Sequence, residues 1–246
     1  MIATPAWPPA STPRLFVDRT LEGLPEIAIG GAQAHYLLSV MRVRPGDPVR
    51  LFDDVSGEWL GEIAHAGKRD LVLAIRGRLQ VREAVPDLWL MVAPIRKGRI
   101  DWVVEKACEL GVARIVPVLT QRAVVDKINP ERLRAHMIEA AEQCGRTALP
   151  ELADMVRLDS LLKAWPADRV LIFADESGGD PIADAIPAGP AAILIGPEGG
   201  FTEAERSSIR AVSQALGVSL GPRILRADTA AIAAIALWMA KSGDWR

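Results

Sequence analysis

ILIGPEGGFT, at residues 193–202, joins an aliphatic run to three glycines and then to a threonine. The aliphatic run, which begins at Ala191, predicts a strand in a sheet that is covered on both faces. Thr202 precedes Glu205 at the spacing of a capping box, which predicts a helix start. In open α/β sheets ligands bind beyond the carboxyl ends of strands, and glycine lets the backbone approach a ligand closely. The segment is therefore interpreted as a ligand-binding loop, with a plain strand-to-helix turn as the alternative.

A second segment, LGPRILRADTA at residues 220–230, has the same strand, turn and helix layout. Two such loops at one edge of a sheet are expected to hold a small ligand such as a nucleoside, because exposed backbone amides and carbonyls can read a base. Neither loop matches the Walker A pattern or G-x-G-x-x-G, so phosphate or dinucleotide binding is not indicated. On the residues alone, Arg226 beside Asp228 is also consistent with a surface arginine next to a helix cap.

From residue 88 onward, predicted strands and helices alternate, which is typical of an α/β domain with a mainly parallel sheet. The predicted strands are Leu88–Ala93, Arg114–Val118, Val170–Ala174, Ala191–Ile195 and the shorter Val218–Leu220. The predicted helices are Arg99–Leu110 before Gly111, a helix opened by Asn129 and Pro130 that runs toward Cys144, one from Thr202 to Gly217, and one from Asp228 or Thr229 to Lys241.

The region before residue 83 has a different pattern, with short apolar runs such as Leu15–Val17, Val49–Phe52 and Leu71–Ile75 separated by turn residues. These runs predict the strands of a small barrel, and His35–Met41 predicts the one helical piece among them. The expected organisation is a flexible tail at 1–13, a barrel domain at 14–82, a linker at 83–87 and the α/β domain at 88–246.

The composition is that of an ordinary globular protein, with 50% hydrophobic and 24% charged residues. The formal net charge of −2 gives no overall basic signal, so any contact with nucleic acid must come from local clusters. Examples are Arg42 with Arg44, and Arg96 with Lys97 and Arg99, for which plain solvated surface is the alternative. Neither a signal peptide nor a transmembrane helix is expected. Cys108 and Cys144 form no disulfide or CxxC pattern, which favours a reducing, cytoplasmic location. The three histidines are scattered away from other metal-ligand residues, so no metal is expected.

Both loops resemble the C-terminal signature loops of the SPOUT methyltransferases that modify uridine N3 of 16S ribosomal RNA. Further stretches resemble the same family in the same order: Lys97-Gly98-Arg99, Glu109-Leu110-Gly111-Val112, Gln121-Arg122, and Glu139–Arg146 before Pro150. The opening Arg14-Leu15-Phe16, with Val40–Val43 and Gly46-Asp47, resembles the PUA-like RNA-binding domain of that family. Where the family usually reads Arg-Thr-Glu-Thr-Ala, this chain has Arg226-Ala227-Asp228-Thr229-Ala230.

The resemblance implies a C-terminal SPOUT domain with a deep trefoil knot, a PUA-like N-terminal β-barrel, and a homodimer. It also implies an S-adenosylmethionine-dependent enzyme that methylates N3 of a uridine in 16S ribosomal RNA, free or within the small ribosomal subunit. Two alternatives remain open. One is a non-catalytic RNA-binding protein of ribosome assembly, and the other is a SPOUT methyltransferase that acts on another RNA.

Site residues follow from the same loops. Arg226 and Glu198 are the first candidates for catalysis, followed by Asp228, because proton loss from N3 needs a carboxylate or a positive charge at the uracil oxygens. Glu142 is a further candidate base. The expected cofactor-binding residues are Ala174, Glu176, Ile195, Gly196, Pro197, Gly199, Gly200, Leu220, Ile224, Leu225, Arg226, Thr229 and Ala230. The expected RNA-binding residues are Arg14, Arg42, Arg44, Lys97, Arg99, Arg122 and Arg146.

Overall fold

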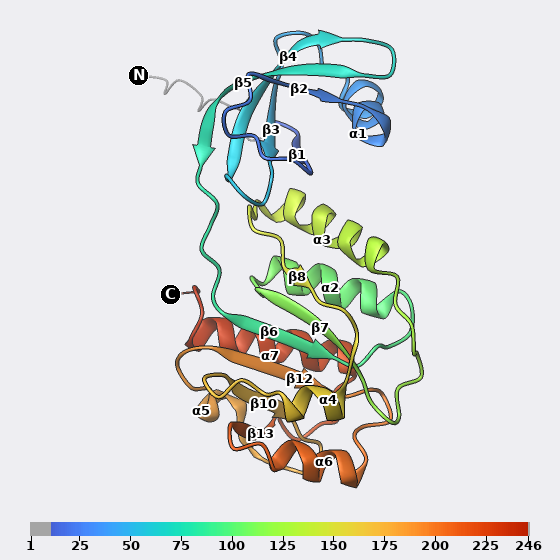
Figure 1. The fold of residues 1–246 in the computed structure, drawn as a ribbon, viewed down its shortest axis with the longest axis vertical. Helices are drawn as coiled ribbons and strands as arrows, with labels where there is room; N and C mark the ends of the chain where they lie inside the picture. The colour runs from blue at the N-terminus through green and yellow to red at the C-terminus, as the bar shows by residue number, and fades with distance from the viewer. Residues whose placement is uncertain (1–10, 246) are drawn as a thin grey trace. The chain divides into compact units, whose positions relative to one another are not determined.

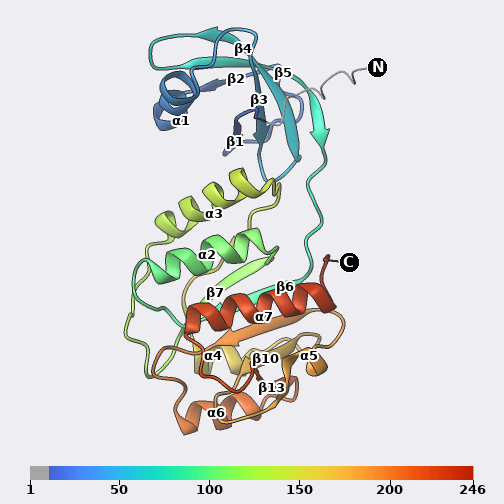
Figure 2. The same cartoon turned by 180° about the vertical axis from the view of Figure 1, so that it is seen from behind.

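The computed structural model describes residues 11–245, and Figures 1 and 2 show the chain from two opposite sides. The chain divides into two compact units. The first comprises the N-terminal part up to Ala84 together with Ala141–Ala148, and the second comprises Val85–Ala140 and the part from Leu149 onward. Most of the predicted tail at residues 1–13 lies outside the described residues.

The first unit is built on a sheet with the strand order β1-β3-β4-β5-β2 (Figure 1). Its elements are β1 (Arg14–Phe16), β2 (Glu26–Ile29), α1 (Gly31–His35), the π-helical turn η1 (Tyr36–Met41), β3 (Pro48–Phe52), β4 (Glu58–Ala66) and β5 (Leu71–Gln80). Strands β1 and β3 are parallel, and the other pairs are antiparallel. The predicted strands and the predicted helical piece of this region are confirmed.

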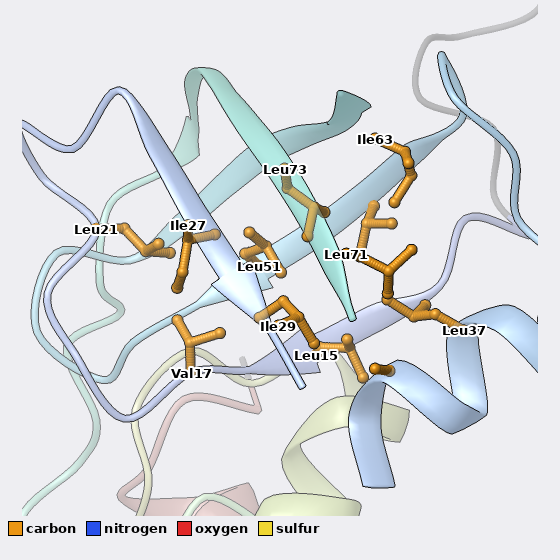
Figure 3. Packing of buried hydrophobic residues seen from close by; sticks show 12 residues of the cluster. Leu15, Val17, Leu21, Ile27, Ile29, Leu37, Leu51, Ile63, Leu71 and Leu73 are labelled. Carbon is orange, nitrogen blue, oxygen red and sulfur yellow. The ribbon is translucent and has the colours of Figure 1, made fainter. Parts of the chain in front are cut away.

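Alternate residues of these strands form the core of the first unit (Figure 3). Leu71 and Leu73 point inward from β5, and Ile27 and Ile29 do so from β2, as the period of two in a strand requires. Leu37 of η1 is fully buried beside them. The helical segment at residues 31–41 therefore contributes Ala34 and Leu37 to this core.

The second unit contains a parallel sheet with the order β11-β13-β10-β12-β6-β7-β8, and β9 also pairs with β7. Its strands are β6 (Leu88–Val92), β7 (Arg114–Leu119), β8 (Glu151–Leu152), β9 (Val156–Arg157), β10 (Val170–Ala174), β11 (Asp180–Pro181), β12 (Ala191–Ile195) and β13 (Ala215–Ser219). Every residue of β12 is buried, as its continuous aliphatic sequence predicts. The predicted α/β class with a mainly parallel sheet is confirmed.

Helices cover both faces of this sheet (Figure 2). The helices that follow β6 in the chain are α2 (Arg99–Glu109), α3 (Pro130–Cys144), α4 (Leu158–Lys163), α5 (Ile182–Ala185), α6 (Glu203–Arg210) and α7 (Ala227–Lys241), of which α3 makes few close contacts with the sheet. On one face, Leu162 of α4 and Ile209 of α6 pack with Met91 and Phe173 of the strands. Helix α7 packs against α2 and against β12 and β6. Among residues 11–245, no helix is both long and apolar enough to cross a lipid bilayer.

The predicted helix starts are confirmed by their caps. Asn129 Oδ1 accepts the Arg132 N–H at 3.0 Å, which opens α3 as predicted. Thr202 Oγ1 accepts the Glu205 N–H at 3.2 Å, and Glu205 Oε2 accepts the Thr202 N–H at 2.8 Å. This reciprocal pair is the predicted capping box of α6.

The prediction that the helix after Thr202 continues to Gly217 is wrong. Helix α6 ends at Arg210, and the chain turns before β13 begins at Ala215. Ile209, Val212 and Leu216 keep a helix-like spacing, but parallel pairing with β10 fixes Ala215–Val218 as a strand. The strand therefore starts three residues before the predicted Val218, and Gly217 lies inside it.

Candidate functional site

A cavity of about 570 Å³ opens in the second unit, and both predicted ligand loops line it. It lies at the carboxyl ends of β10, β12 and β13, with the start of α7 also in its wall. The volume is in the range of small-molecule and cofactor sites, roughly 300–1,000 Å³. The loops at 196–200 and 220–230 therefore converge on one hollow of nucleoside size, as the sequence predicts.

The loop at 196–201 is held in shape by its own packing. A Cβ atom on Gly196 would lie 2.9 Å from the ring of Phe201, which is buried against this position. Gly200 has a φ of +66°, in the left-handed region that favours glycine, and its N–H donates to the Pro197 carbonyl at 2.9 Å. Glu205 Oε1 also accepts the Gln121 N–H at 2.7 Å, so the capped helix start is tied to the loop after β7.

A charged cluster forms the wall beyond the end of β10. The Asp175 side chain is only 1% exposed, and it pairs with Arg210 and, at 3.8 Å, with Arg206 Nε. Ser177 donates to Asp175 Oδ1 through its hydroxyl at 2.7 Å and its N–H at 3.0 Å. Glu176 pairs with Arg206. Because both arginines lie on α6, the cluster fastens the loop after β10 to that helix.

Burial alone would raise the pKa of Asp175, but hydrogen bonds from Ser177 and Arg210 outweigh this effect and hold the pKa below its ordinary value. A carboxyl group whose pKa is lower in the folded than in the unfolded state stabilises the folded state at pH values above its unfolded-state pKa, which is about 3.9 for an aspartate. This contribution is lost as the pH falls through the folded pKa.

We therefore expect Asp175→Asn to lower the free energy of unfolding by about 1–3 kcal/mol at pH 7, because two arginines lose a charged partner. The difference from wild type should begin to shrink below about pH 4, where Asp175 of the unfolded chain becomes protonated, and should disappear below the lower pKa of Asp175 in the folded state. Urea unfolding at pH 7 and at pH 3 checks both statements. A difference that is equally large at both pH values would contradict the assignment of Asp175 as the charged anchor.

Three charged side chains meet where α2, the 196–201 loop and α7 come together. Arg99 Nη1 lies 3.1 Å from Glu198 Oε1 and 3.9 Å from Asp228 Oδ2. The other oxygen of Asp228, Oδ1, accepts the Thr229 N–H at 2.8 Å. Within residues 11–245, no hydrogen bond or ion pair involves Glu198 Oε2. Glu198 lines the cavity, whereas Asp228 does not.

Most residues predicted to bind a cofactor line this cavity. These are Ala174, Glu176, Ile195, Gly196, Pro197, Gly200, Leu220, Ile224, Leu225, Arg226 and Ala230. Gly199 and Thr229 are not in its wall. The Gly199 carbonyl accepts a hydrogen bond from Arg122 Nη1 at 2.9 Å, and Thr229 is exposed on α7.

The residues predicted to bind RNA are spread over both units. In the second unit, Arg99 lines the cavity, Arg122 contacts its loop, and Lys97 is exposed outside its wall. In the first unit, Arg42 and Arg44 belong to the turn after η1. Arg14 is buried there against Glu58 and donates to the carbonyls of Ala141 and Arg146.

Two other predicted residues are engaged in the first unit. Arg146 is 5% exposed and donates to the Ala148 carbonyl. Glu142 Oε1 accepts the Phe16 N–H at 2.9 Å. The side-chain groups that the sequence suggests for RNA binding or proton transfer therefore make hydrogen bonds within the first unit at Arg14, Glu142 and Arg146.

Several lining residues have no role assigned from the sequence, among them Asp175, Arg206 and Arg223, whereas Arg96 belongs to a basic cluster that the sequence analysis names. Asp175 follows the predicted strand Val170–Ala174 directly, so its place at a strand end was the available signal. Arg206 gave no such signal, because an arginine inside a helix usually faces solvent.

The chain is similar to known RNA-modifying proteins along most of its length. Residues 82–239 match the RNA methyltransferase domain family, and residues 29–76 match the RNA methyltransferase PUA domain family. The ribosomal RNA small subunit methyltransferase E of Rickettsia conorii is 30% identical over 229 residues, which cover 91% of this chain and 93% of that protein. Its counterpart from Bacillus subtilis is 28% identical, over 90% of this chain and 94% of that protein.

Two solved structures are similar over nearly the whole chain. One is a ribosomal RNA small subunit methyltransferase E from Neisseria gonorrhoeae bound to S-adenosylmethionine, with a TM-score of 0.85 and 27% identity over 96% of this chain and 100% of that one. The other is the Legionella pneumophila protein Lpg2936 in complex with the same cofactor, with a TM-score of 0.85 and 29% identity over 95% and 99% of the two chains.

Proposed function

The chain belongs to the RNA methyltransferase family, with a SPOUT-type catalytic domain and a PUA-like domain, and on that premise we propose that it methylates N3 of a uridine in 16S ribosomal RNA. The methyl donor in this proposal is S-adenosylmethionine. The observation that carries it is the convergence of the 196–200 and 220–230 loops on one nucleoside-sized cavity.

The residues of the cavity fit this donor. Glycines lie where the backbone must come close, since a Cβ on Gly196 would strike Phe201 and Gly200 is left-handed. Small and aliphatic residues, including Ala174, Ile195 and Leu225, offer an apolar surface for an adenine ring. S-adenosylmethionine, when bound here, supplies an electrophilic methyl group. We assign its binding to the predicted residues that line the cavity, with Gly199 and Thr229 next to them.

Uridine N3 carries a proton at neutral pH, so a group of the protein must favour its loss. Glu198 is the better candidate base, because its Oε1 is oriented by Arg99 and it lines the cavity. Asp228 has one oxygen on the Thr229 N–H and the other facing Arg99, so it is proposed to orient Arg99. Arg226 also lines the cavity, and it is proposed to stabilise negative charge on the uracil oxygens.

The decisive experiment is mass spectrometry of 16S ribosomal RNA from a strain that lacks the gene and from the same strain complemented with it. We expect one 3-methyluridine to disappear in the deletion strain and to return on complementation. Incubation of purified protein and S-adenosylmethionine with unmethylated 16S RNA or with small subunits then identifies the form that is methylated. An unchanged methylation pattern in the deletion strain would reject the assignment to 16S RNA.

The proposal includes a homodimer that acts in the cytoplasm, where ribosomal RNA is found, and it includes no metal. One stripe of α7, formed by Ala233, Ala236, Leu237 and Ala240, is at least partly exposed, and Leu237 itself is 39% exposed. An apolar stripe at helical spacing on a surface is typical of a helix that a partner covers. A second copy of the chain is the partner that we propose.

We expect the wild type to have the mass of a dimer in light scattering, and Leu237→Glu to raise the dimer dissociation constant at least about tenfold, because a charge would be buried at the interface. Lys163→Glu changes the charge of an exposed residue at the end of α4, on another helix, and is the control for charge alone. A wild-type protein that is monomeric at micromolar concentration would refute the dimer.

A further inference from the structure

The cavity wall contains five arginines with different electrostatic environments. They are Arg96, Arg99, Arg206, Arg223 and Arg226. Arg99 is paired with Glu198 and Asp228, and Arg206 with Asp175 and Glu176. No hydrogen bond or ion pair reaches the side chains of Arg96, Arg223 and Arg226 from any residue between 11 and 245.

The three arginines without partners come from two sides of the cavity. Arg96 lies just before α2, and its carbonyl accepts the Arg99 N–H at 3.1 Å, which fixes the backbone there. Arg223 and Arg226 lie on the loop between β13 and α7. All three are exposed, and Ile224 beside them is 89% exposed. The positive charge is therefore at the rim of the cavity and accessible to a large ligand.

We propose that Arg96 and Arg223 bind phosphate oxygens of the RNA on either side of the nucleotide that enters the cavity. A guanidinium without a carboxylate partner is free to donate two parallel hydrogen bonds to a phosphate. Ionic contacts of this kind position an RNA without reading its sequence. The inference rests on the proposed function and deepens it, since it assigns two residues that hold the substrate backbone at the same site.

This assignment differs from the one that the sequence suggests. The sequence offers Arg96, Lys97 and Arg99 as one basic cluster, and of these only Lys97 and Arg99 are expected to bind RNA. Lys97 does not line the cavity, and Arg99 is occupied by Glu198. The structure assigns the phosphate contact in this run to Arg96 instead.

The test is a binding titration of full-length protein with unmethylated 16S ribosomal RNA at several salt concentrations. We expect Arg96→Gln and Arg223→Gln each to weaken RNA binding about tenfold, and to reduce the slope of log K against log salt by about 0.7–1. The affinity for S-adenosylmethionine, measured by calorimetry, should stay within about twofold. Lys163→Gln is the matched control. It removes one exposed positive charge at the end of α4, outside the cavity wall, and its slope should equal that of wild type.

Each other outcome has a definite meaning. Unchanged salt slopes in both arginine variants, with tight wild-type binding, would overturn the inference while the proposed function stands. A loss of cofactor affinity with intact RNA binding would also overturn it, because the arginines would then bind the cofactor carboxylate. An equal loss of RNA affinity and salt slope in Lys163→Gln would show that the effect comes from the net charge of the protein, and it would overturn the inference. A wild type that binds neither 16S RNA nor S-adenosylmethionine would reject the proposed function itself.

Discussion

Replacing Gly179 with alanine is expected to lower the affinity for S-adenosylmethionine about 100-fold. A Cβ atom at this position would lie 2.5 Å from the Gly217 carbonyl oxygen and 2.9 Å from the Val218 nitrogen. Both atoms are backbone of β13, so no rotamer change relieves the clash. The segment that leads into β11 must move away from β13, and Gly178 and Val218 of the cavity wall move with it. A misplacement of about 1 Å can lower an enzymatic rate about 100-fold, and we expect a loss of the same order in affinity because the displaced wall no longer fits the cofactor.

Calorimetric titration with S-adenosylmethionine measures the affinity, and circular dichroism shows whether the variant is folded. Gly77→Ala is the control, because within residues 11–245 the added Cβ meets no atom closer than 4 Å apart from its chain neighbours, and because Gly77 lies in the first unit. Overpacking of this kind also destabilises by about 1–3 kcal/mol, so a folded variant with a lower melting temperature is expected. A folded Gly179→Ala protein with wild-type affinity would show that this loop does not shape the cofactor site.

The sequence predicts the parts of the fold that local chemistry controls. The caps at Asn129 and Thr202 satisfy backbone N–H groups with side chains three residues away, so the pattern and the geometry agree. Four strands, β6, β7, β10 and β12, are buried on both faces, and this burial is predicted by their continuous aliphatic sequences. The two glycine loops could be located for the same reason, because they follow directly after strands.

The parts that were missed depend on contacts between distant segments. Strand β13 lies on the opposite side of β10 from β12, although α6 and β13 follow β12 in the chain. No pattern within residues 211–219 encodes that pairing, and the spacing of its aliphatic residues suits a helix equally well. The short strands β8, β9 and β11 have two residues each, which is too short for an alternating pattern to indicate a strand.

The function of an individual arginine is also decided by distant neighbours. Arg14 resembles an RNA-binding residue in sequence, but Glu58, 44 residues away, pairs with it, and backbone carbonyls near residue 141 accept its other donors. Arg99 is neutralised by Glu198, 99 residues away. The sequence pattern therefore located the two loops that line the cavity, whereas the pairing of charges in three dimensions was needed to choose among the basic residues.

Replacing Glu198 with glutamine is expected to lower kcat by at least about 100-fold, because a positioned general base contributes roughly 10²- to 10⁴-fold. Glutamine keeps the size of the side chain, and its amide oxygen can still accept the Arg99 hydrogen bond that Glu198 Oε1 accepts at 3.1 Å. The geometry of the rim should therefore survive, and the affinities for S-adenosylmethionine and RNA should stay within about threefold. Single-turnover methylation of unmethylated 16S RNA, with both ligands saturating, measures the loss in the chemical step.

Asp228→Asn distinguishes loss of the proposed base, Glu198, from loss of a carboxylate that only orients Arg99. Asp228 shares Arg99 with Glu198 but lies outside the cavity wall, so its amide variant should lower kcat only about tenfold, through a less well oriented Arg99. If Glu198→Gln and Asp228→Asn each retain more than one third of wild-type kcat, neither of these two carboxylates removes the N3 proton. Stabilisation of the uracil anion by Arg226 would then have to account for proton loss, because a nearby guanidinium lowers the pKa of a bound base. In that case Arg226→Gln, rather than Glu198→Gln, would abolish methylation.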